Sequence, residues 1–246
     1  MDRSLFVVMS GARETLRAQA SVSNNLANVN TTGFKQDLEQ FRSMPVFGPG
    51  YPSRVYALNE RPATDFDPGP IRSTGRELDV AVKGDGWIAV QAADGSEAYT
   101  RRGDLRITPE GLLQTGDGHP VLGDNGPIAI PPAQKVDIGS DGTISIVPLG
   151  EKPDVLAVVD RIKLVRAAPE QLEKGEDGLI RLKSGQPAEA DAGITLVSGA
   201  LEGSNVSSVA ALVDMIELSR RYELQVKMMK TAEDDADTAA QLLRMV

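Results

Sequence analysis

Apolar residues recur at a helical spacing near the N-terminus. Eight positions alternate in steps of three and four residues, and six of the eight are apolar: Leu5, Val8, Ala12, Thr15, Gln19, Val22, Leu26 and Val29. This spacing is typical of a helix that packs along another helix. Asp2 is a candidate N-cap, and Gly33 is a candidate stop after a stretch rich in Asn and Thr. We therefore predict an N-terminal helix within residues 1–35.

The same alternation returns at the C-terminus, where only two of ten positions are polar: Leu212, Met215, Ser219, Tyr222, Val226, Met229, Glu233, Ala236, Ala240 and Leu243. No Gly or Pro occurs from Val206 to Val246. A helix of that length extends about 60 Å at 1.5 Å per residue, more than a compact domain of this size encloses. We predict a C-terminal helix within residues 204–246.

The middle of the chain has the pattern of an antiparallel sheet. Segments such as Leu78–Lys83, Arg161–Val165 and Gly193–Val197 alternate apolar and polar residues, as strands with two different faces do. Tight-turn signals separate them at Gly84-Asp85-Gly86, Asp94-Gly95, Asp117-Gly118, Asp124-Asn125-Gly126, Asp141-Gly142 and Asp177-Gly178. We predict a β-rich outer domain over residues 71–203, which the pattern leaves open as a sandwich or a half-barrel.

Residues 36–70 show no sustained period and contain six prolines: Pro45, Pro49, Pro52, Pro62, Pro68 and Pro70. Proline removes a backbone donor and disfavours helix in the residue before it. We interpret this segment as an extended, irregular connector.

Together these elements predict an α+β protein, with long N- and C-terminal helices pairing as a coiled-coil-like stalk and an antiparallel all-β middle domain. The alternative is that each terminal helix is an ordinary amphipathic helix packed on its own domain. Two such helices at opposite ends of one chain favour pairing with each other and with other copies.

Composition narrows the function without identifying it. The chain has 246 residues, 41% of them hydrophobic, and no cysteine, so it forms neither disulfides nor thiolate sites. No apolar run approaches the ~20 residues that cross a bilayer. The start, Met1-Asp2-Arg3-Ser4, lacks a basic region and a small-residue cleavage site, so we expect any export to proceed without a cleaved signal peptide.

Candidate chemistry is sparse. The net charge is −9 and no basic block stands out, which argues against nucleic acid as a partner. His119 is the only histidine, and the Asp-Gly pairs fit tight turns better than the ligand spacing of an EF-hand. We predict no catalytic, metal-binding or cofactor-binding residue. With 35 acidic residues, a cell-wall carbohydrate-active enzyme stays open as a rival, although aromatics make up only 4% of the chain.

One long segment carries a specific resemblance. Residues 23–35, Ser-Asn-Asn-Leu-Ala-Asn-Val-Asn-Thr-Thr-Gly-Phe-Lys, resemble the N-terminal signature of the flagellar rod and hook family of axial proteins. Further matches follow in order at residues 78–87, 99–103, 118–123 and 201–206. Within the family, the short chain and residues 85–91 are most similar to the proximal-rod subclass, with the distal rod as the alternative.

The resemblance implies a structural subunit rather than an enzyme. Such a subunit is exported unfolded through the flagellar type III apparatus and assembles in the periplasm with copies of itself and other rod subunits. It forms part of the drive shaft that transmits torque from the motor to the hook. The terminal helices are then expected to form the inner wall and the β domain the outer layer. A secreted adhesin or an injected tube protein would share the helical ends and differ in its partners.

The apolar seams are our candidate subunit interface. We expect it to include Asn24, Asn25 and Asn28, whose amides either fix register between subunits or cap the end of a helix. The predicted interface residues are Leu5, Val8, Ala12, Val22, Asn24, Asn25, Leu26, Asn28, Val29, Leu212, Met215, Tyr222, Val226, Met229 and Leu243.

Overall fold

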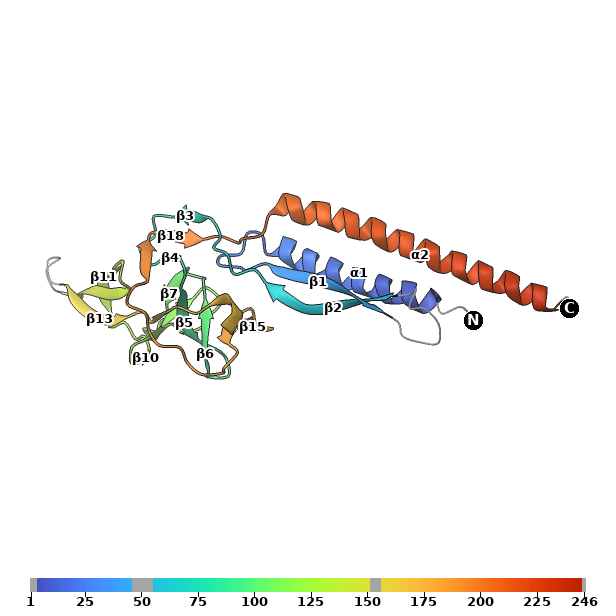
Figure 1. Ribbon diagram of the computed structural model, residues 1–246. Helices are drawn as coiled ribbons and strands as arrows, with labels where there is room; N and C mark the ends of the chain where they lie inside the picture. The colour runs from blue at the N-terminus through green and yellow to red at the C-terminus, as the bar shows by residue number, and fades with distance from the viewer. Residues whose placement is uncertain (1–3, 46–54, 151–155, 245–246) are drawn as a thin grey trace. The chain divides into compact units, whose positions relative to one another are not determined.

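The computed structural model describes residues 4–45, 55–150 and 156–244 (Figure 1). Contacts divide the chain into two compact units. Unit 1 consists of Met1–Asn28, Gln36–Asp65 and Val206–Val246, and unit 2 of Val29–Lys35 and Phe66–Asn205. Helices at both ends and a central antiparallel β region confirm the α+β class.

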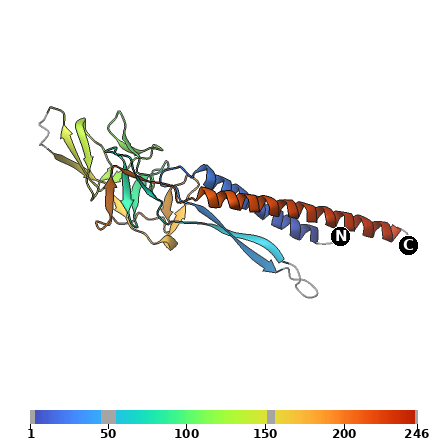
Figure 2. The same cartoon turned by 90° about the horizontal axis from the view of Figure 1, so that it is seen from above.

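Unit 1 contains two helices and a hairpin: α1 (Ser4–Ala27), β1 (Asp37–Pro45), β2 (Val55–Thr64) and α2 (Ser208–Arg244). α1 and α2 lie side by side in opposite directions (Figures 1 and 2). The backbone of α1 comes close to α2 at Gly11, where an added Cβ would lie 3.1 Å from Nε2 of Gln225. The hairpin also contacts α1.

Within residues 36–70, the described residues 37–45 and 55–64 form strands, so the prediction of an irregular connector was wrong for these parts. β1 and β2 pair as an antiparallel hairpin, with Phe41 opposite Asn59 and Met44 opposite Tyr56. Proline is compatible with this hairpin because both strands are edges, whose outer backbone groups need no partner within the sheet. Pro62 falls where the register shifts, between the paired residues Glu60 and Ala63. Pro49 and Pro52 lie outside the described residues.

Unit 2 is built from short strands, and every strand pairing described for it is antiparallel. Its largest sheet has the order β14 (Leu164–Val165), β5 (Trp87–Gln91), β6 (Glu97–Thr100), β16 (Ile180–Leu182), β15 (Leu172–Lys174), with the 3-10 helix η1 (Pro169–Gln171) before β15. A three-stranded sheet has the order β11 (Ala133–Ile138), β12 (Thr143–Pro148), β13 (Ala157–Arg161). The remaining pairs are β3 (Ile71–Ser73) with β18 (Ala200–Glu202), β4 (Val80–Lys83) with β17 (Thr195–Ser198), β7 (Leu105–Ile107) with β8 (Leu113–Thr115), and β9 (Leu122–Gly123) with β10 (Gly126–Pro127).

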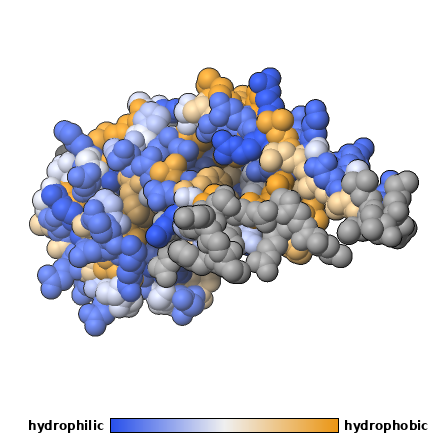
Figure 3. All heavy atoms as spheres, turned by 45° about the vertical axis from the view of Figure 1, so that its right-hand side comes forward, coloured by the Kyte–Doolittle hydropathy of each residue, from blue (hydrophilic) through white to orange (hydrophobic). Residues whose placement is uncertain are grey.

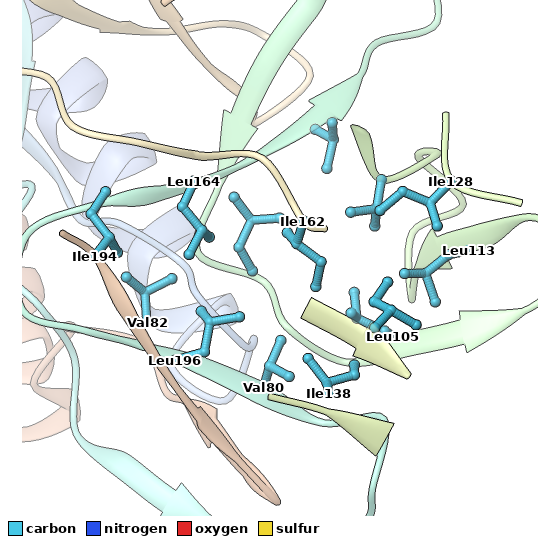
Figure 4. Packing of buried hydrophobic residues seen from close by; sticks show 14 of the residues in the cluster. Val80, Val82, Leu105, Leu113, Ile128, Ile138, Ile162, Leu164, Ile194 and Leu196 are labelled. Carbon is cyan, nitrogen blue, oxygen red and sulfur yellow. The ribbon is translucent and has the colours of Figure 1, made fainter. Parts of the chain in front are cut away.

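Strand β5 divides the interior of unit 2 into two hydrophobic clusters. Ile88 and Val90 point into the larger cluster, and Trp87 and Ala89 into the smaller one, as the two-residue period of a strand requires. Side chains from many strands converge in the larger cluster (Figure 4). Unit 2 therefore has a core of its own.

The predicted Asp-Gly turns are confirmed at Gly95, Gly118, Gly142 and Gly178, all with positive φ. In three of these turns the carboxylate accepts the backbone amide two residues on, at Asp94, Asp141 and Asp177, whereas Asp117 pairs with Arg102. Asp94 accepts hydrogen bonds from the hydroxyl and the amide of Ser96, and these bonds hold the pKa of Asp94 below its ordinary value. The turn residues thus have a structural explanation that needs no bound metal.

Candidate subunit interface

Exposed apolar side chains are concentrated in unit 1. Of the twenty large hydrophobic side chains that are exposed among the described residues, sixteen belong to unit 1. Of the thirty-four buried hydrophobic residues, only five do, and three of those are alanines. Figure 3 shows hydrophobic side chains at the surface of the part of the molecule formed by the helices. Unit 1 is therefore far less able than unit 2 to cover its own apolar surface.

One face of α2, called the inward face below, is covered by other parts of the chain. Eight described residues along α2 are buried or half-buried. Besides Ser219, they follow steps of four and three: Ala211, Met215, Leu218, Tyr222, Gln225, Met229 and Ala232. Met215, Tyr222 and Met229 belong to the predicted seam, whereas Leu212 and Val226 are exposed. Apolar residues stand on both sides of this face, so spacing alone did not determine which ones turn inward. The side chain of Leu243 lies outside the described residues.

A second apolar stripe runs along α2 and points to solvent. Its members are Val209, Leu212, Val213, Ile216, Leu224 and Met228, all exposed. At 100° per residue this stripe lies opposite the inward face. Charged residues lie in the same sector of the helix at Glu217, Arg220, Glu223 and Lys227, so the stripe is continuous only over residues 209–216. We call these six residues the outer stripe of α2.

On α1 the predicted seam coincides with the covered face over most of its length. Ala12 is buried, and Val8, Val22 and Leu26 are half-buried. Leu5 is exposed. Val29 is half-buried but follows the helix, which ends at Ala27 rather than at the predicted stop, Gly33. The last turn is tightened at this end: the amide of Asn28 donates both to the carbonyl of Asn24, as in an α-helix, and to that of Asn25, as in a 3-10 turn.

The three asparagines have different surroundings. Asn25 is 2% exposed, and both ends of its amide are engaged within its own unit: Nδ2 donates to the carbonyl oxygen of Asp37 at 2.7 Å, and Oδ1 accepts from the Asp37 amide at 3.0 Å. Asn25 thus ties the end of α1 to the start of β1, instead of offering its amide to a neighbouring subunit. Asn28 donates to the Asn24 carbonyl at 2.9 Å, which fits the helix-end alternative for that pair.

A buried cluster of charges joins distant parts of unit 2. Nζ of Lys35 donates to Oε1 of Glu202 at 2.7 Å, and Nη1 of Arg101 donates to Oε2 at 2.9 Å. The side chains of Lys35, Arg101 and Glu202 are only 2%, 2% and 1% exposed. The ring of Trp87 lies under both cations, 5.0 Å from Arg101 Cζ and 5.9 Å from Lys35 Nζ. Sequence reasoning missed this cluster because its members are up to 167 positions apart.

Comparison with known proteins gives these features a context. Family models match at residues 5–35 (flagella basal body rod protein), 81–146 (flagellar hook protein FlgE/F/G D1 domain) and 197–242 (flagellar basal body rod FlgEFG protein C-terminal). The chain is 43% identical over 251 residues to the flagellar basal-body rod protein FlgF of Escherichia coli K12, and 42% identical over 251 residues to that of Salmonella typhimurium LT2. Both alignments cover 100% of each chain.

The chain belongs to the flagellar basal-body rod protein family. It is also similar to the rod protein FlgG of Bacillus subtilis 168, at 33% identity over 258 residues and with 95% of this chain and 96% of that one covered. The family is structural, which agrees with the prediction that the chain is not an enzyme. Each of the three matched segments contains one of the buried charges: Lys35, Arg101 or Glu202.

One cavity of this rod-family chain is lined by a carboxylate that is already engaged. A cavity of about 610 Å³ in unit 2 is lined by Glu97, Lys163 and Leu122, among others. Both oxygens of Glu97 accept from Lys163 Nζ, at 2.9 and 2.8 Å, and Oε1 also accepts from the Tyr99 hydroxyl. A carboxylate held in this way is a poor general acid or nucleophile.

No helix of the described residues has the length and apolarity needed to cross a membrane.

Proposed function

We propose that this chain is a structural subunit of the flagellar proximal rod, and that it polymerises with other axial proteins into the drive shaft that transmits torque from the motor to the hook. Family membership supports a rod role. The observation that carries the mechanism is the contrast between the two units: unit 2 has its own hydrophobic core, whereas unit 1 leaves sixteen large apolar side chains exposed.

The energetics favour coupling between folding and assembly. Fixing a residue costs about 1–2 kcal/mol of backbone entropy, and unit 1 offsets little of this with buried apolar area. Leu212, Ile216 and Leu224 are each about half exposed. Covering the rest of each side chain contributes roughly 1 kcal/mol, since complete burial contributes about 1.5–3 kcal/mol. A neighbouring subunit that covers the outer stripe therefore supplies the stabilisation that unit 1 lacks.

The predicted interface residues extend this proposal. Leu5, Leu212 and Val226 are exposed and available to neighbouring subunits, while Ala12, Met215 and Tyr222 pack within unit 1 and shape the helix pair that is presented. Export through the flagellar type III apparatus is part of the same proposal, because a chain without cysteine needs no oxidation after it leaves the cell. The mass of the protein from purified basal bodies checks the prediction that no signal peptide is cleaved.

The outer stripe provides the test. In a strain that lacks its own copy of the chain, a variant carrying Leu212→Ser, Ile216→Ser and Leu224→Ser should be exported at normal levels and fail to enter rods. Electron microscopy of basal bodies and swimming in soft agar measure the effect. The matched control carries Leu149→Ser and Val158→Ser, two apolar residues of unit 2 that are more exposed than the three residues of the stripe.

The control should assemble and swim as the wild type does. Wild-type motility of the triple variant at equal protein level would overturn the assignment of the stripe. Failure of the control to assemble would show that exposed apolar residues in general, rather than those of unit 1, control assembly.

A further inference from the structure

The chain passes between unit 1 and unit 2 at four places: after residues 28, 35, 65 and 205. On the unit 2 side, these crossings begin or end in three short segments: residues 29–35, the start of 66–70, and the end of 203–205. Each segment is far from the others in sequence. The interactions that hold these three segments together determine how rigidly the segments are attached to the rest of unit 2.

The buried charge cluster contacts the first two segments directly, and Glu202 itself leads into the third. Besides binding the Glu202 carboxylate, Lys35 Nζ donates to the carbonyl of Asp67 at 2.8 Å. The amide of Gly69 donates to Glu202 Oε1 at 3.0 Å, and the amide of Gly33 donates to the carbonyl of Glu202 at 2.8 Å.

Asn205 completes the set. Its side-chain Nδ2 donates to the carbonyl of Asp67 at 3.2 Å, and its backbone amide donates to the carbonyl of Phe34 at 3.3 Å. Residues 33–35, 67–69 and 202–205 are thereby linked by direct hydrogen bonds around one carboxylate.

The third charge anchors this arrangement to the core. Arg101 Nη1 binds Glu202, while Nη2 donates to the carbonyl of Gly84 at 2.8 Å. The guanidinium also lies over the ring of Trp87, a member of the smaller hydrophobic cluster. Glu202 is thus joined through Arg101 to the turn after β4 and to Trp87 of β5, and through Lys35, Gly33 and Gly69 to the connecting segments.

A cluster of this kind is better suited to fixing geometry than to adding stability. Removing three ionic groups from water costs about as much as their mutual attraction returns, so an apolar cluster of the same shape would stabilise the fold as well. Charged groups differ in their directionality: each donor must meet a particular oxygen, and removing one charge leaves the remaining buried charges unbalanced.

We propose that Lys35, Arg101 and Glu202 form a mechanical clamp, which holds the segments that enter and leave unit 2 together as one rigid structure. Load that reaches unit 2 along any of these segments is then shared by all of them and by the core under Trp87. The clamp itself is independent of the biological role, whereas its use under torque rests on the proposed function.

Native-state hydrogen exchange of the full chain tests the clamp. In Glu202→Gln, amides in residues 29–35, 66–70 and 203–205 should exchange at least tenfold faster than in the wild type, because Lys35 and Arg101 lose their common anion. Amides of β12 should stay within twofold. If Glu202→Gln does not fold, Glu202→Asp replaces it, since the shorter side chain keeps the charge but cannot reach both cations.

The matched control is Glu97→Gln, which breaks the Lys163–Glu97 pair, a half-buried ion pair in the same unit that touches no connecting segment. It should leave exchange in the three segments unchanged. Uniform acceleration throughout unit 2 in the Glu202 variant, or equal loosening of the segments in the control, would overturn the clamp.

Rotation under load separates the two proposals. Cells carrying Glu202→Asp should build rods in normal number. In viscous medium, however, their flagella should rotate more slowly or their rods should be lost, whereas the control should behave as the wild type does. Unimpaired rotation at high load, with faster exchange in the three segments, would remove the mechanical role. Failure of the wild-type chain to enter rods would refute the proposed function and leave the exchange result to decide the clamp.

Discussion

Gly33 occupies a position where even a methyl group should be costly. Its φ is +68°, and an added Cβ would lie 2.5 Å from the carbonyl carbon of Arg101 and 2.6 Å from the amide nitrogen of Arg102. Both contacts are with backbone, so no side-chain rotation relieves them. Its amide also donates to the carbonyl of Glu202. Gly33→Ala therefore combines backbone strain with a steric clash and threatens a hydrogen bond.

The expected cost follows from these parts. A left-handed conformation costs a non-glycine residue about 1–2 kcal/mol, and overpacking adds typically 1–3 kcal/mol. We expect Gly33→Ala to lower the free energy of unfolding of unit 2 by roughly 2–5 kcal/mol. Gly185→Ala is the matched control, because Gly185 has the same φ of +68° and no atom within 4 Å of the added Cβ. It should cost only the strain, about 1–2 kcal/mol.

Urea denaturation followed by fluorescence measures the difference. Trp87 is the only tryptophan and is buried in unit 2, so its emission reports on that unit alone. The two variants differ by the overpacking cost of about 1–3 kcal/mol. With a slope of about 1–3 kcal/mol per molar urea, the Gly33 variant should unfold on the order of 1 M earlier than the control. Equal midpoints for the two variants would refute the close packing of residues 29–35 against the body.

Two further predictions concern Asn25 and Tyr99. Asn25→Leu should reduce incorporation into rods, since it removes both hydrogen bonds between Asn25 and Asp37, and it should leave the urea midpoint detected by Trp87 fluorescence unchanged. Asn24→Leu, at an exposed site, should assemble normally. A lower yield of basal bodies from Asn24→Leu than from Asn25→Leu would contradict the assignment. Burial raises the pKa of Tyr99 to about 12, so the unfolded chain ionises first and unit 2 should lose about 1.4 kcal/mol per pH unit as the pH rises from 10 towards 12. Tyr99→Phe should abolish that slope in alkaline urea titrations, and a slope that persists in the variant would assign the alkaline loss to other groups.

Local pattern was enough to predict the helices and the β body. A three-four spacing without Gly or Pro favours a long helix, and Asp-Gly pairs separate strands whatever the tertiary fold. It was harder to predict which residues of α2 face inward, because apolar residues flank the inward face on both sides. Leu212 and Val226 were expected in the seam, but Ala211 and Gln225 take those inward positions.

The hairpin and the charge cluster depend on contacts that local sequence does not encode. Prolines in β1–β2 argued against strands, but edge strands and a register shift accommodate them. Lys35, Arg101 and Glu202 look like ordinary surface charges in the sequence, and only the fold brings them together. The resemblance located all three segments without indicating that they meet.

Amide exchange of the dilute, monomeric full chain tests most directly whether unit 1 needs its neighbours. Protection should be strong in unit 2 and weak in residues 4–27 and 208–241, with helicity by circular dichroism well below the 24 and 37 residues of α1 and α2. Protection of both helices should then appear in the assembled rod. A monomer whose helices are fully formed and as protected as the β core would contradict the coupling of folding to assembly.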